Sequence, residues 1–250
     1  MGNAARRATR EKIRLQREQE RKREQRRRQV TITLSVVGVV VLIVAMVAIW
    51  QSTRNRSEGY AGELAPISRT AEGDVVMARP GVNAPVLDIY EDFQCPACKM
   101  FEETSGDTIK RLAAEGKVKV VYHPIVLFGQ EPLRGNSLRA STALRCVPGD
   151  RPWMALHDRL FKEQPREGDV GFAVDDLVAW GKEAGVTDAD FESCVRGQQG
   201  ASEQLDYSSR TMQNAKIQGT PTVKLDGKEL GDTAFIPGSL EKAVLEAQAK

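Results

Sequence analysis

Two cysteines separated by two residues carry the most reactive chemistry in this sequence. Cys95 and Cys98 enclose Pro96 and Ala97 in a C-x-x-C spacing. If a helix begins there, the two sulfurs lie close enough for a disulfide to close across its first turn. The motif therefore predicts thiol–disulfide exchange, although a C-x-x-C is also half of a common zinc site.

Two alternatives to exchange follow from the same motif. A zinc site needs a second close pair of Cys or His, but the two histidines of the chain, His123 and His157, stand apart from each other. A purely structural disulfide between Cys95 and Cys98 would gain little from closing so short a loop, which suits redox exchange better. We expect His157 to be packed or on a helix surface, His123 to be structural, and exchange to need no metal and no organic cofactor.

The elements around the motif predict different roles for the two cysteines. The half-alternating segment 85–93 is typical of a strand, and 96–115 of a helix with Pro in its first turn and Gly116 after its end. A Cys at this junction faces free backbone N–H groups and the positive end of the helix dipole, which favour a thiolate. Cys95 is therefore the predicted nucleophile, and Cys98 the predicted resolving thiol.

Two carboxylates stand directly before the motif. Glu91 or Asp92 could take the proton of Cys98 during exchange, directly or through water. The alternative, which we favour from sequence, is an exposed or salt-bridged carboxylate at the end of a strand.

The other two cysteines are isolated and 48 positions apart. Four cysteines allow three pairings, and the pairing 95–98 with Cys146–Cys194 separates a reactive pair from a structural one. A disulfide between Cys146 and Cys194 would stabilise the chain by ~4 kcal/mol in the chain-entropy model. A second redox centre is the alternative, but neither of these cysteines begins a helix after a strand.

Charge is distributed unevenly along the chain. Residues 1–29 hold 12 Lys and Arg against 4 Asp and Glu, so the rest carries a net −6 within a total of +2. The 21 uncharged residues 30–50 follow, and as a helix they would span ~31 Å, the thickness of a bilayer core. The pattern predicts an uncleaved membrane anchor with a cytoplasmic head and everything after Trp50 outside.

Two other readings of this region are weaker. A cleaved signal peptide would have a shorter apolar stretch and an A-x-A cleavage pattern, which Ala48–Trp50 does not supply. A nucleic-acid arm is the second alternative for the head, but topology already explains its charge, and we expect no nucleic-acid partner. An exterior location also suits the cysteines, because disulfides persist on the oxidising side of a membrane.

The rest of the chain predicts an α/β domain. Residues 51–73 are polar and without hydrophobic period, so we expect a linker ahead of a domain at 74–250. A helical block at about 133–218 is expected in the middle of its sheet. The expected strands are 74–78 (an edge strand), 85–93, 117–127, 222–225 and 228–230, and the expected helices are 96–115, 133–147, 153–164, 174–184, 188–195, 203–216 and 239–248.

Several motifs together resemble the DsbA-like branch of the thioredoxin superfamily, in its membrane-anchored actinobacterial form. The resemblance covers about residues 84–247 and rests on Asp92–Cys98, Trp153–Gln164, Ala184–Cys194 and Gly219–Thr222, in the expected order. It implies a thioredoxin fold with a helical insertion. It also implies a cis Pro221 against the active-site disulfide, which leaves the backbone of Thr220 free to pair with an extended substrate.

The resemblance also implies an activity. It is the introduction of disulfides into reduced secreted or cell-surface proteins, with a membrane quinone-linked thiol oxidase recharging Cys95 and Cys98. A reductase or isomerase is the alternative within the enzymes, and a membrane-tethered interaction protein is the alternative outside them. Ala97 departs from the strongly oxidising members, which often carry His there, so we expect a less oxidising enzyme.

Overall fold

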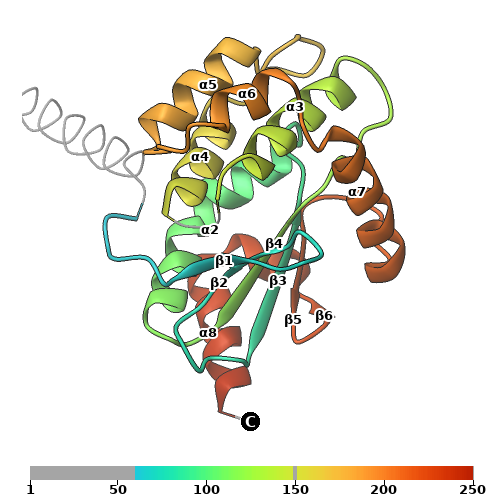
Figure 1. Ribbon diagram of the computed structural model, residues 1–250. Helices are drawn as coiled ribbons and strands as arrows, with labels where there is room; N and C mark the ends of the chain where they lie inside the picture. The colour runs from blue at the N-terminus through green and yellow to red at the C-terminus, as the bar shows by residue number, and fades with distance from the viewer. Residues whose placement is uncertain (1–59, 149–150, 250) are drawn as a thin grey trace, which may run out of the picture. The chain divides into compact units, whose positions relative to one another are not determined.

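A six-stranded mixed sheet forms the centre of the structure (Figure 1). The computed structural model describes residues 60–148 and 151–249. The strand order is β1-β2-β4-β3-β5-β6, in which β3 lies parallel to β4 and antiparallel to β5. The strands are β1 (Ile67–Arg69), β2 (Val75–Met77), β3 (Val86–Glu91), β4 (Lys119–Pro124), β5 (Thr222–Leu225) and β6 (Lys228–Glu229).

The helices that the structure describes form two groups. α2 (Pro96–Ala114) connects the parallel strands β3 and β4, and α8 (Pro237–Gln248) follows the short 3₁₀ helix η1 (Gly231–Phe235) at the end. A block of five helices lies between β4 and β5 in sequence, and Figure 1 shows α3 to α6 gathered together beyond the sheet. The block comprises α3 (Leu133–Arg145), α4 (Arg151–Lys162), α5 (Val174–Glu183), α6 (Phe191–Arg196) and α7 (Ala201–Ala215). The expected α/β fold with an inserted helical block is confirmed.

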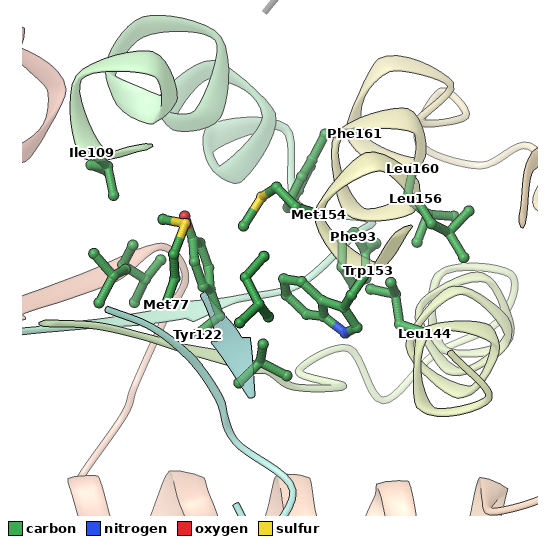
Figure 2. Close-up of a cluster of buried hydrophobic side chains, with 14 of the residues drawn as sticks. Met77, Phe93, Ile109, Tyr122, Leu144, Trp153, Met154, Leu156, Leu160 and Phe161 are labelled. Atoms are coloured by element: carbon green, nitrogen blue, oxygen red, sulfur yellow. The ribbon is translucent and has the colours of Figure 1, made fainter. Parts of the chain in front are cut away.

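The core joins the sheet to this helical block. Tyr122 of β4 and Trp153 of α4 are both buried, and their ring centroids are 5.6 Å apart. Phe93, just after β3, packs against Phe161 at 4.8 Å. Figure 2 shows these side chains converging from the sheet and α4. Burying several large apolar side chains stabilises the docking of α4, at roughly 1.5–3 kcal/mol for each.

The start of the folded domain corrects two expectations. Ile67–Arg69, assigned above to a polar linker at 51–73, forms the edge strand β1. The strand expected at the edge, 74–78, is instead internal, because β2 pairs with β1 on one side and with β4 on the other. Three residues are too short to show a period, and Ala65 and Ile67 are buried all the same.

The expected membrane anchor at 30–50 and basic head at 1–29 lie outside the described residues. Among the residues that are described, none of the helices is both long and apolar enough to cross a bilayer.

Candidate active site

The C-x-x-C motif lies at the junction between β3 and α2. Cys95 is the residue before the helix, with extended backbone angles, and Pro96 occupies the first helical turn. The Cys95 carbonyl accepts hydrogen bonds from the N–H groups of Cys98 (3.1 Å) and Lys99 (3.2 Å). Pro suits this position because the N–H groups of the first helical turn have no acceptor within the helix, so the N–H that Pro lacks costs no hydrogen bond. The helix therefore begins where the sequence predicts and presents its N-terminus to Cys95.

The pKa values of the two thiols are shifted in opposite directions. Both are free cysteines, and Cys98 is completely buried while Cys95 is 7% exposed. A hydrogen bond from the Cys98 thiol, outweighing the effect of burial, lowers the pKa of Cys95 to about 6, with help from the backbone N–H groups of Ala97 and Cys98. Burial, followed by the neighbouring Cys95, raises the pKa of Cys98 well above its ordinary value. At neutral pH Cys95 is thus a thiolate beside a protonated Cys98.

A loop that is distant in sequence lies against Cys95. The Thr220–Pro221 peptide is cis, as the resemblance implies. The Cys95 Sγ lies 3.1 Å from the carbonyl oxygen of Thr220, to which it donates as a thiol. A polar hollow of about 500 Å³ opens beside this loop, lined by Lys216, Gln218, Gly219, Thr220, Pro221, Thr222 and Glu229.

Both carboxylates before the motif are buried, which corrects the expectation of an exposed strand end. Glu91 is paired with His157 at 2.8 Å, in line with the salt-bridged form of that expectation. Asp92 accepts hydrogen bonds from the N–H groups of Gln94 (2.7 Å) and Leu127 (2.7 Å) and from the Ser137 hydroxyl. Burial outweighs these bonds and raises the pKa of Asp92 to about 6. Asp92 reaches Cys98 through its backbone N–H, 3.5 Å from Sγ. A role for Asp92 or Glu91 as proton acceptor stays a prediction.

Comparisons with known protein families and solved structures identify the family to which this chain belongs. A family model described as thioredoxin matches residues 77–243, two thirds of the chain. The chain belongs to the thioredoxin family. A search of curated proteins gives no match.

Solved structures that resemble this thioredoxin-family chain include several named oxidoreductases. The reduced disulfide bond oxidoreductase DsbG from Mycobacterium tuberculosis is 25% identical with a TM-score of 0.61, over 78% of this chain and 93% of that one. Oxidised DsbA from the same organism is 25% identical with a TM-score of 0.59, over 74% and 92%. BdbD from Bacillus subtilis, at 19% identity, a TM-score of 0.61 and coverage of 76% and 100%, is alike in fold alone.

The helical insertion of this thioredoxin-family chain holds the motif through amide side chains that sequence reasoning missed. Gln164, just after α4, donates to the carbonyls of Phe93 (2.8 Å) and Cys95 (3.0 Å). Gln94 donates to the carbonyl of Pro165 at 3.0 Å and accepts from Asn136 of α3. Amides near a motif are common, so their types and positions alone could not have revealed these contacts.

The second pair of cysteines forms the predicted disulfide. Cys146 directly follows α3 and Cys194 lies in α6, and their Cα atoms are 5.8 Å apart. The bond joins α3, which also carries Asn136, to α6 within the insertion.

Proposed function

We propose that this chain is an extracytoplasmic thiol–disulfide oxidoreductase that introduces disulfides into secreted or cell-surface proteins. The observation that carries the proposal is that the two thiols have oppositely shifted pKa values. The pKa of Cys95 is lowered to about 6, and the pKa of Cys98 is raised. A nucleophile needs a thiolate, and a buried partner kept as a thiol can resolve it. The named oxidoreductases among the similar structures support the same activity.

The reaction moves two electrons from two substrate thiols to the Cys95–Cys98 disulfide. A substrate thiolate attacks Sγ of Cys95, the bond between Cys95 and Cys98 breaks, and Cys98 leaves and takes up a proton. A second substrate thiolate then attacks the substrate sulfur of the mixed disulfide, and Cys95 leaves as a thiolate. A low pKa makes Cys95 a good leaving group, so the second step is favoured.

The direction of exchange follows from which form of the pair is stabilised. Hydrogen bonds to the Cys95 thiolate exist only in the reduced enzyme, so they favour the reduced pair and make the disulfide oxidising. Ala97 supplies no hydrogen-bonding side chain, so the potential is expected to fall short of the most oxidising members. A thioredoxin-like reductase, whose disulfide is the more stable form, would lack this bias.

Substrate is proposed to lie along the Thr220–Pro221 loop. An extended segment can add to an exposed backbone edge through main-chain hydrogen bonds. The Thr220 carbonyl lies 3.1 Å from Cys95 Sγ, so a segment paired there would bring its own cysteine to the nucleophile. The neighbouring polar hollow offers room for side chains of such a segment.

The proposal includes a membrane setting that the charge pattern supports. Residues 30–50 would anchor the chain, with the basic head 1–29 in the cytoplasm and the catalytic domain outside. Reduced Cys95 and Cys98 would be reoxidised there by a membrane quinone-linked thiol oxidase. No organic cofactor takes part in the exchange itself.

The activity is tested with the oxidised full chain and a reduced peptide that contains two cysteines. We expect one peptide disulfide for each Cys95–Cys98 disulfide consumed, measured by mass spectrometry after alkylation. Cys95→Ala should abolish the reaction, whereas Met100→Ala, an exposed position on the same helix, should leave it unchanged. Full oxidation of the peptide by Cys95→Ala would contradict the proposal and favour an interaction protein.

A further inference from the structure

A second cluster of chemically reactive side chains lies inside the domain. It comprises Glu91 at the end of β3, Glu102 on α2 and His157 on α4. A carboxylate oxygen from each glutamate and a ring nitrogen of His157 lie within 4.8 Å of one another. Three separate elements thus converge on one point, which spacing in the sequence could not reveal.

Three of the four carboxylate oxygens of this cluster lack donors. Both Oε atoms of Glu102 and Oε2 of Glu91 are buried and have no hydrogen-bond partner. Buried charges in proteins are normally paired or coordinate a metal, because an unsatisfied one costs several kcal/mol. These three oxygens have no donor beside the one contact from His157 to Oε1 of Glu91, so they offer acceptor sites to a further cation.

His157 is held as metal-binding histidines usually are. Its Nδ1 lies 3.2 Å from Oδ1 of Asp158, and its Nε2 lies 2.8 Å from Oε1 of Glu91. A metal-binding histidine typically donates one ring N–H to a carboxylate and turns the other nitrogen to the ion. Asp158 is itself fixed by Lys110 at 2.6 Å. The ring is therefore oriented with Nε2 toward the glutamates.

We propose that Glu91, Glu102 and His157 form a buried site for one divalent transition-metal ion such as Zn²⁺. Zinc takes His nitrogen and Glu oxygen at about 2.0–2.2 Å in a tetrahedral arrangement, so ligand atoms on one ion lie about 3.3–3.6 Å apart. Separations of up to 4.8 Å in the cluster would shorten by roughly 1 Å when the ion binds, which rotation of the glutamate side chains can supply. Two carboxylates and a neutral imidazole then balance the ion, and Asp158 balances Lys110.

A proton is the competing occupant of the cluster. Burial raises the pKa of Glu102 above its ordinary value, and a neutral Glu102 could donate to Oε2 of Glu91. The buried Tyr122 hydroxyl, which also has no partner, is a further donor from β4. Metal content separates the two, because a shared proton leaves the chain free of metal.

The site is tested by expressing the full chain in zinc-supplemented medium and purifying it without chelators. Cys95 and Cys98 are kept oxidised, so that neither thiolate can bind metal. Inductively coupled plasma mass spectrometry should find a single divalent ion per chain. Glu102→Gln and His157→Gln should each lose it, whereas Glu103→Gln, the exposed neighbour on the same helix, should retain it.

Stability gives a second measurement on the same proteins. EDTA treatment through a cycle of heating should lower the Tm of the wild-type chain and of Glu103→Gln, but not that of Glu102→Gln. A wild-type chain without metal, or a Glu102→Gln chain with as much metal as the wild type, would overturn the site. Neither result bears on exchange at Cys95 and Cys98.

Discussion

The sulfur of Cys95 lies 3.1 Å from the carbonyl oxygen of Thr220, although 125 positions separate the two residues. The helical insertion occupies most of that separation, yet β5 pairs directly with β3 and returns the chain to the motif. The nucleophile and the backbone proposed to hold substrate are therefore carried by adjacent strands. This arrangement lets the two act on the same substrate segment.

Removing the thiol of Cys98 should make Cys95 less acidic. The hydrogen bond from Cys98 is the largest cause of the lowered pKa of Cys95, so Cys98→Ala should raise that pKa from about 6 toward the free value of about 8.5. Thiolate absorbance in the ultraviolet, followed against pH, measures the change. Met100→Ala is the matched control, and an unchanged pKa in Cys98→Ala would show that the helix terminus alone sets it.

The same Cys98→Ala chain should trap its substrate. Without a resolving thiol, a mixed disulfide formed at Cys95 can be released only by an outside thiol. A peptide activated as a mixed disulfide should accumulate on this variant as an adduct stable on a non-reducing gel. Accumulation on Cys95→Ala instead would reverse the roles assigned to the two cysteines.

Stability should fall as pH rises because of His123. Burial alone would lower the pKa of His123, but its hydrogen bonds to Asp74 (2.9 Å) and Asp88 (3.0 Å) outweigh burial and raise it. A raised pKa means that this stabilisation is complete below the unfolded value of about 6.5 and is lost as pH rises through the folded value. The Tm of the oxidised chain should therefore decline as pH rises above about 6.5.

The contribution of His123 is isolated by comparison with His123→Gln. This variant should have a lower Tm at pH 6, and the difference from wild type should shrink as pH rises. Titrating groups that do not contact His123 act on both chains and cancel in the difference, and Asp74, whose pKa is below its ordinary value, stays ionised above pH 6. A constant difference across pH would mean that His123 is neutral between its two carboxylates.

The disulfide between Cys146 and Cys194 should stabilise the fold without taking part in exchange. Replacing both cysteines with alanine should lower the free energy of unfolding by ~4 kcal/mol, in the chain-entropy model for a closed loop of this length. Urea denaturation measures the loss. Peptide oxidation below the unfolding transition should keep the wild-type rate, and a large loss of rate would indicate a second redox centre.

Sequence patterns anticipated the elements that carry strong local signals. The strand before Cys95 and the helix after it were predicted within two residues at each end, because Pro and Gly mark the helix ends. The helical block was also predicted, since 3.6-residue periods persist between its Pro and Gly breaks. Cys95 and Cys98 were identified from their spacing alone.

Other features depend on packing that no local pattern shows. β1 is too short to carry a period, and Asp92 is buried only because Ser137, Gln94 and Leu127 close around it. The convergence of Glu102 and His157 depends on how α4 docks against α2. Such contacts depend on tertiary structure, which a single sequence predicts only in outline.

The reduction potential of the Cys95–Cys98 pair tests the central claim most directly. The full chain would be equilibrated in glutathione buffers, and the fraction of reduced Cys95 read by alkylation and mass spectrometry. A thiolate stabilised at Cys95 predicts a value toward about −120 mV, the value of DsbA, and above that of thioredoxin. A value near about −270 mV would contradict a disulfide donor and indicate a reductase that awaits an electron source.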